Sequence, residues 1–166
     1  MLEVRLTAVR VDLQSNTPVV LLKEAAGERS LPIFIGAPEA TAIAFAIQGI
    51  DVPRPMTHDL MADLIRALGA RVARVVVTEV QDTTYLAEIH LQVNDQVLEI
   101  SARPSDAIAL AARTDAPIFV DEELMGMAGL VIVETDEDEE AQEHSEEIVG
   151  EFREFLDNVR PEDFSS

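Results

Sequence analysis

The fold class is decided by residues 72–113, which read VARVVVTEVQDTTYLAEIHLQVNDQVLEISARPSDAIALAAR. Alternating apolar and β-branched residues predict three strands, over Val72–Val80, Tyr85–Val93 and Val97–Ala102. The pair Asn94-Asp95 between the last two strands predicts a tight hairpin. The alanine-rich segment after them predicts a helix that begins at Pro104 or Ser105 and ends at Arg113. Strands that follow one another so closely indicate an antiparallel meander.

The residues on either side of this segment predict further strands and helices. Turn segments SNTP and AAGERS separate three apolar runs, which predict strands over Leu2–Val11, Val19–Lys23 and Leu31–Ile35. Two helices are expected next, over Glu39–Gln48 and His58–Leu68, and a strand over Pro117–Val120 precedes an acidic turn, Asp121–Glu123. Because strands and helices come in runs instead of alternating, we expect an α+β domain. Its mixed, mostly antiparallel sheet should pack with two to three helices.

The helix expected over His58–Leu68 illustrates how its ends and buried face are predicted. Thr57 has the side chain of an N-cap, and Asp59 in the first turn complements the helix dipole. Helical spacing predicts one core-facing stripe, made of Leu60, Leu64, Ile65 and Leu68.

The carboxyl-terminal part of the chain differs sharply in composition from the rest. Of the net charge of -20, -12 arises from Glu134 onward, where 14 acids face two arginines. We therefore expect a domain over residues 1–133 and an acidic flexible linker over residues 134–147. A C-terminal amphipathic helix and tail should occupy residues 148–166, with a docking face made of Ile148, Phe152, Phe155, Leu156 and Val159.

Composition limits the classes of protein to which this chain can belong. With 166 residues and 48% hydrophobic content, the chain can bury a core without disulfides, and it has no cysteine. No apolar run reaches the roughly 20 residues of a membrane span, and no export signal is visible at the start. We expect a cytoplasmic protein. The excess of acids, with a single lysine, argues against a broad basic surface for nucleic acid.

Two helix starts carry residues suited to phosphate chemistry. The first, PRPMTHDL, places Arg54, Thr57, His58 and Asp59 where free N–H groups favour an anion. His58 suits a general base, and Asp59 could orient it or ligate a metal ion. The alternative is an ordinary helix cap.

The second start, ARPSDAIALA, repeats the pattern with Arg103, Ser105 and Asp106. Arg54 and Arg103 together could clamp a phosphodiester. Glu39, after FIGAPE, would join Asp59 and Asp106 as oxygen ligands of a divalent cation, Mg²⁺ or Mn²⁺. No organic cofactor is expected, because no Walker A loop or GxGxxG occurs. Each acid could instead serve only as a favourable first-turn residue.

Three ordered blocks, LPIFIGAPEATAIAFAIQG, PRPMTHDL and ARPSDAIALAARTDAPIFV, closely resemble those of the bifunctional nuclease family. The resemblance spans about Leu2 to Glu123 and implies cleavage of DNA and RNA, with nucleic acid as substrate. It carries over to these polar positions: Glu39, Arg54, Thr57, His58, Asp59, Arg103, Ser105 and Asp106. The family often has an acid before ARPSDA, where this chain has Ser101.

Three readings of these residues remain open from the sequence. In the first, Arg54, Thr57, Arg103 and Ser105 bind phosphate, while His58, Asp59 and Asp106 carry metal-assisted phosphodiester hydrolysis. In the second, the helix starts form a non-catalytic regulatory module that binds a small anionic ligand or a protein partner. In the third, the two segments are a folding and dimer-contact device, in which Arg54 and Arg103 pair internally with Asp106 and Asp59. From an apolar terminal helix and many strands we also expect a homodimer.

Overall fold

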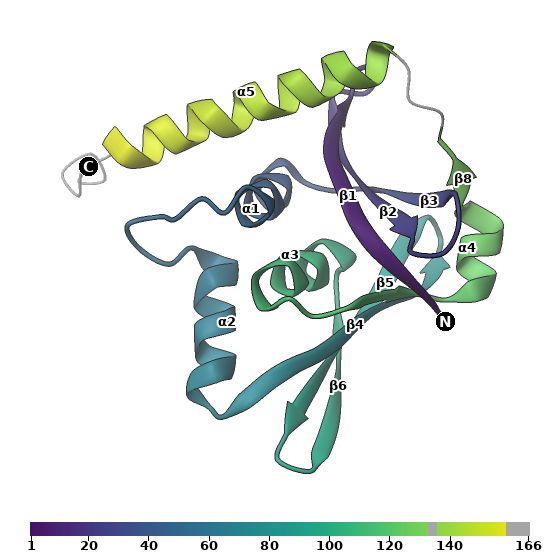
Figure 1. The fold of residues 1–166 in the computed structure, drawn as a ribbon, viewed down its shortest axis with the longest axis vertical. Coiled ribbons are helices and arrows are strands. Elements are labelled where there is room, and N and C mark those ends of the chain that lie inside the picture. The colour runs from purple at the N-terminus through teal and green to yellow at the C-terminus, as the bar shows by residue number, and fades with distance from the viewer. Residues whose placement is uncertain (133–135, 159–166) are drawn as a thin grey trace.

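A mixed sheet of eight strands forms the body of the protein within residues 1–132 and 136–158, which the computed structural model describes (Figure 1). The strand order is β6-β5-β4-β7-β1-β2-β3-β8. The strands cover β1 (Leu2–Asp12), β2 (Thr17–Glu24), β3 (Arg29–Phe34), β4 (Ala70–Gln81), β5 (Thr84–Val93), β6 (Gln96–Ala102), β7 (Ile118–Val120) and β8 (Leu130–Val131). The α+β class and the mostly antiparallel sheet are therefore confirmed.

The short strand β7 joins two antiparallel meanders, β1-β2-β3 and β4-β5-β6. It pairs antiparallel with β1, where Leu2 faces Val120, and parallel with β4, where Val75 faces Ile118. The hairpin between β5 and β6 turns at Asn94, whose φ of 52° lies in the left-handed region that asparagine tolerates. The predicted hairpin is confirmed.

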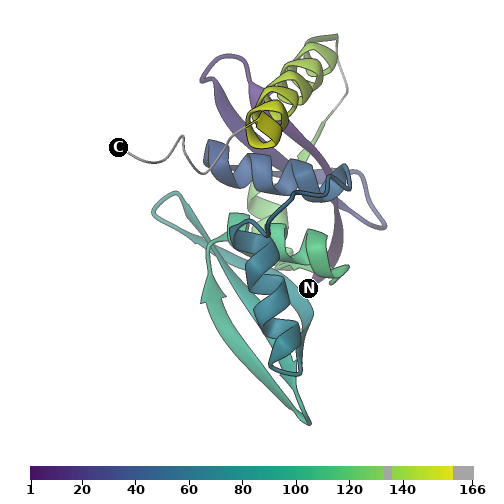
Figure 2. The ribbon, with the colours of Figure 1, turned by 90° about the vertical axis from the view of Figure 1, so that its left-hand side faces the viewer.

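Three helices cover one side of this sheet, namely α1 (Ala37–Ile47), α2 (Thr57–Ala67) and α3 (Pro104–Thr114) (Figures 1 and 2). The core between helices and sheet is made of fully buried aliphatic side chains, among them Ile43 of α1, Ile108 and Leu110 of α3 and Val77 of β4. Alanines on α1 and α3 let these helices lie close together. Consequently, the amino-terminal turns of the three helices are held in fixed relation to one another.

The acidic turn expected at Asp121–Glu123 is instead the start of a fourth helix, α4 (Glu122–Ala128). Asp121 is its N-cap, and its carboxylate accepts hydrogen bonds from the backbone N–H groups of Glu123 and Leu124. The acids were read as a turn because the helix is only seven residues long, too short for a clear apolar period.

The apolar stripe predicted for α2 is wrong for three of its four residues. Leu60, Leu64 and Leu68 are 51, 54 and 81% exposed, whereas Ile65 packs against the core. The buried residues of α2 are His58 and Ala62. At about 100° per residue, the three leucines form a second apolar face beside the buried one. Periodicity predicts that such faces exist, but it cannot tell which face the neighbouring helix covers.

The acidic segment expected to be a flexible linker belongs largely to a long helix, α5 (Asp136–Asn158). Glutamate has good helix propensity, and acids are favoured near a helix start, so the segment can extend a helix that docks at its far end. Within the docked part, Val149 is buried and the Phe152 ring lies 5.8 Å from that of Phe45 on α1.

The docking face of α5 differs in part from the predicted one. Phe152 and Leu156 do pack against the cluster around Phe45, but Ile148 and Phe155 are 40 and 55% exposed. Val159 lies outside the described residues. Among the described residues, no helix combines the length and the apolarity needed to cross a membrane.

Candidate functional site

The first turns of three helices meet at one cluster of polar side chains. Glu39 lies in the first turn of α1, His58 in that of α2 and Asp106 in that of α3. Free backbone N–H groups at helix starts create positive potential, which stabilises the two carboxylates and would also favour an added anion. The cluster is completed by Arg103, the N-cap residue of α3.

His58 and Asp106 form the buried part of the cluster. Nε2 of His58 lies 2.9 Å from Oδ1 of Asp106, and the histidine side chain is only 8% exposed. A carboxylate held against one ring nitrogen fixes the orientation of an imidazole and selects its tautomer. If Nε2 carries the proton, Nδ1 presents its lone pair as a base. Among the described residues, no hydrogen bond engages Nδ1.

Arg103 binds two carboxylates at the rim of the cluster. Its Nε donates to Oδ2 of Asp106 at 2.7 Å and one terminal nitrogen to Oδ1 at 3.0 Å, while the same nitrogen lies 3.0 Å from Oε1 of Glu39. The arginine side chain is nevertheless 66% exposed, whereas Glu39 and Asp106 are 18 and 25% exposed. The two carboxylates therefore hold the guanidinium in place, and its remaining N–H groups face solvent.

The electrostatics of Asp106 follow from these contacts. Burial raises the pKa of its carboxyl, but hydrogen bonds from Arg103 and His58 outweigh burial, so the pKa lies below its ordinary value. The hydrogen bond to Asp106 in turn raises the pKa of Arg103. Both groups are charged at neutral pH, and Asp106 cannot itself act as a general acid there.

Asp59 does not join this cluster but lies beside it. Its Oδ1 accepts a hydrogen bond from Nε of Arg113 at 2.5 Å, and its Oδ2 accepts one from the backbone N–H of Met56 at 2.9 Å. Burial raises the pKa of Asp59, yet these two hydrogen bonds outweigh it and the pKa is lowered. Thr57 is thus not the cap: α2 begins at Thr57 itself, with Met56 as N-cap.

The candidate metal ligands are not assembled into one site. Glu39 and Asp106 share Arg103, whereas Asp59 pairs with Arg113. Within the described ranges, no group of three or more histidine and acidic residues is arranged to hold a metal ion. In this arrangement the three predicted carboxylates do not fit a divalent cation, because an arginine occupies the position that the cation would take between two of them.

Of the remaining predicted residues, Ser105 is buried beside Asp106 in the first turn of α3, and Thr57 precedes His58 in α2. Arg54 is exposed on the loop before α2, and no ion pair of its side chain is found within the described residues. Arg103 pairs with Asp106, as in the third hypothesis, but its side chain is 66% exposed and not enclosed. Asp59 is paired with a different arginine from those expected.

Arg113, which the sequence did not single out, also lies near the site. Its side chain is 9% exposed, and besides binding Asp59 it donates to the backbone carbonyl of Ala109. A signal was present, because Arg113 follows Asp106 by seven residues and so lies on the same face of α3. The consecutive residues His58 and Asp59 of α2 thus contact two side chains on one face of α3.

A second buried histidine, His90, lies apart from the cluster on β5. Its Nε2 is 3.2 Å from Glu88, and Nε of Arg74 donates to its Nδ1 at 3.4 Å. These contacts occupy both ring nitrogens within the sheet. His90 is therefore a structural residue of the sheet.

Comparison with known proteins places these residues in a family context. A family model described as bifunctional nuclease domain matches residues 20–133. An uncharacterized protein of Mycobacterium tuberculosis is 45% identical over 164 residues, which cover 99% of this chain and 98% of that protein. Bifunctional nuclease 1 of Oryza sativa subsp. indica is 26% identical over 126 residues, and bifunctional nuclease 2 of Oryza sativa subsp. japonica is 31% identical over 119. The chain spans 38 and 37% of these two plant proteins.

Proposed function

The chain belongs to the bifunctional nuclease domain family, and we propose that it hydrolyses phosphodiester bonds of DNA and RNA at the cluster of Glu39, His58, Arg103 and Asp106. The observation that carries the proposal is the pair formed by His58 and Asp106, 2.9 Å apart and in contact with an exposed arginine. An oriented imidazole beside a solvent-facing guanidinium combines a base with a phosphate ligand, the two groups that hydrolysis of a charged ester needs.

In this proposal each residue acts through its observed contacts. Nδ1 of His58 takes a proton from the attacking water as its oxygen bonds to phosphorus and the bond to the leaving ester oxygen breaks. Asp106 holds Nε2 and stabilises the imidazolium that forms, and the leaving oxygen takes up a proton from solvent. The free N–H groups of Arg103 bind the phosphoryl oxygens and stabilise the charge that develops on them. Glu39 orients Arg103. Arg54, Thr57 and Ser105 would contact the phosphate from the two helix starts. Asp59 acts as a positioning residue, since its carboxylate fixes the start of α2 next to His58.

The proposal includes no step at a metal ion, because Glu39, Asp59 and Asp106 do not form one ligand set. Assays of cleavage in Mg²⁺, in Mn²⁺ and in a chelator measure separately whether a divalent cation supports cleavage. We also propose a cytoplasmic location, which agrees with the lack of cysteine.

The test is cleavage of single-stranded DNA and RNA by purified protein, in Mg²⁺, in Mn²⁺ and in a chelator. His58→Ala should lose about 100-fold or more in rate, as removal of a general base does, and Arg103→Ala should also lose most activity. Arg5→Ala serves as the matched control for Arg103→Ala, because Arg5 is exposed on β1 and does not belong to the cluster.

Thermal unfolding must show that each variant is folded. The proposal is refuted if the wild-type protein cleaves nothing in any of the three conditions. It is equally refuted if folded His58→Ala and Arg103→Ala proteins cleave as fast as the wild type.

A second candidate function, a non-catalytic regulatory module, has its own supporting observation. Two carboxylates already bind Arg103, and the whole chain carries a charge of -20, which weakens binding of a nucleic acid. In that case the same preparations should show no cleavage, but a thermal shift with a small anionic ligand or a protein partner.

A homodimer is also part of our proposal. The exposed leucine face of α2, made of Leu60, Leu64 and Leu68, is a contiguous apolar stripe of the kind that mediates association. Sedimentation analysis should show a dimer for the wild type and a monomer for Leu64→Glu. A monomeric wild type at micromolar concentration would refute the homodimer.

A further inference from the structure

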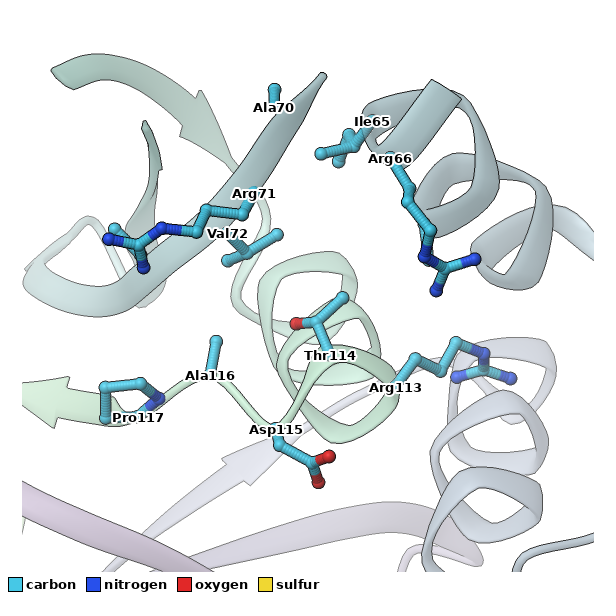
Figure 3. Close-up of a pocket in the computed structure, with 12 residues that line it drawn as sticks. Ile65, Arg66, Ala70, Arg71, Val72, Arg113, Thr114, Asp115, Ala116 and Pro117 are labelled. Carbon is cyan, nitrogen blue, oxygen red and sulfur yellow. The ribbon is translucent and has the colours of Figure 1, made fainter. Parts of the chain in front are cut away.

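A cavity of about 440 Å³ lies between the carboxyl ends of α2 and α3 and the start of β4. The cluster lies at the opposite, amino-terminal ends of these two helices. Its walls come from three places (Figure 3): Ala62, Ile65 and Arg66 of α2, residues 70–73 of β4, and residues 113–117 at the end of α3. The volume lies within the range of about 300–1,000 Å³ that is typical of small-molecule sites.

The polar lining of this cavity is dominated by arginine. Arg66, Arg71 and Arg113 line it, three of the 12 basic residues in a chain with 32 acids. Asp115 is the one acid among the lining residues. Figure 3 shows Arg66 and Arg113 on the same side of the cavity, with Arg71 on the opposite side. Positive charge is therefore concentrated here against the average of the whole molecule.

The three arginines differ in how firmly they are already held. Arg113 is 9% exposed and bound to Asp59. Arg66 pairs with Asp63, but both side chains are more than half exposed, at 71 and 52%, so this surface pair contributes little and can be exchanged for another anion. Arg71 is exposed and forms no ion pair within the described part of the chain. Two of the three guanidinium groups can thus bind a ligand without breaking a buried contact.

Apart from Thr114, the rest of the lining is apolar. Ile65, Val72, Ala116 and Pro117 give the cavity a wall that suits an uncharged, flat body more than a solvated ion alone. Guanidinium groups bind phosphate through paired N–H donors and stack on planar groups. We propose that this cavity binds a small organic phosphate, with Arg71 on the phosphate and with Arg66 and the apolar wall against its planar, uncharged body.

Such a site is distinct from the cluster, but Arg113 lies between the two. Arg113 lines the cavity with its stem and binds Asp59, the neighbour of His58, with its guanidinium. The inference does not rest on the proposed nuclease activity, since it uses no residue of the cluster.

The experiment measures binding of AMP, inorganic phosphate and adenosine to the full chain by calorimetry. AMP should bind, inorganic phosphate should bind more weakly, and adenosine should not bind. Arg71→Ala should weaken AMP binding about tenfold, which corresponds to loss of one charge-assisted contact. Arg66→Ala should act in the same direction. Amide signals of residues 70–73 and 114–116 should shift in NMR spectra on addition of AMP.

Matched variants separate this site from the cluster. Arg5→Ala removes an exposed arginine on β1 that does not line the cavity, and it should bind AMP as the wild type does. Arg71→Lys should keep part of the affinity. The proposal is overturned if AMP does not bind. It is also overturned if binding is unchanged in Arg71→Ala and Arg66→Ala, or if it is lost only in Arg103→Ala.

Discussion

Replacement of Arg113 by methionine tests the contact that joins α2 to α3. Methionine keeps much of the apolar stem but removes the guanidinium, so Asp59 loses the partner that lies 2.5 Å away. Removing one member of a fully buried ion pair costs about 3–5 kcal/mol. Since Asp59 is 30% exposed and water can solvate it in part, we expect a loss of about 2 kcal/mol in the free energy of unfolding.

Arg66→Met is the matched control for this variant. Both arginines lie in the last turn of a helix, where a positive charge interacts favourably with the helix dipole. Unlike the pair of Arg113 with Asp59, however, the pair of Arg66 with Asp63 is exposed. Its loss should cost less than about 0.5 kcal/mol. Any difference between the two variants therefore reports the burial of the contact between Arg113 and Asp59.

Urea denaturation followed by circular dichroism measures both variants, and thermal unfolding should show a decrease in Tm of about 4–8 °C for Arg113→Met. Asp59→Asn completes a double-mutant cycle. The doubly substituted protein should lose clearly less than the sum of the single losses, because the two residues act as a pair. Equal losses in Arg113→Met and Arg66→Met, or strict additivity in the cycle, would refute the reasoning.

Three further predictions concern acid stability, a turn and a close approach. The pKa of Asp106 is lower in the folded protein than its unfolded value, near 3.8, so the ionised carboxylate stabilises the fold at pH values above 3.8. This stabilisation disappears as pH falls through the lower folded-state pKa. Asp106→Asn should therefore make stability less dependent on pH in that window, as measured by acid unfolding. Gly69→Ala should lower the free energy of unfolding by about 1 kcal/mol, because φ at residue 69 is +72°. Gly126→Ala should raise it by about 0.5 kcal/mol, because Gly126 lies inside a helix with free space around its Cα. Urea titrations measure both changes. In Gly36→Ala, the added Cβ lies against the Glu39 carboxylate, whose flexible end can move away. The rate of cleavage should therefore change more than Tm does. An unchanged rate would contradict this prediction.

Much of the fold followed from local pattern. The strands of both meanders and helices α1 and α3 were predicted within a few residues, because alternating apolar residues, turn chemistry and alanine content act over short stretches of chain. The element that failed most clearly is the start of α5. There the acidic composition indicated no structure, although continuity with a docked helical segment supports one.

The sequence by itself determined that two helices begin with an arginine and an acid nearby, since such starts depend on neighbouring residues. Only the tertiary structure decided which charges pair. His58 meets Asp106 across 48 residues of chain, and Arg113 meets Asp59 across 54. These partners depend on how α1, α2 and α3 stack on the sheet, and that stacking also buries Ala62 instead of Leu64. The two arginine-bearing starts thus became one histidine–aspartate cluster with a single arginine, because helix packing, and not sequence spacing, sets distances across the core.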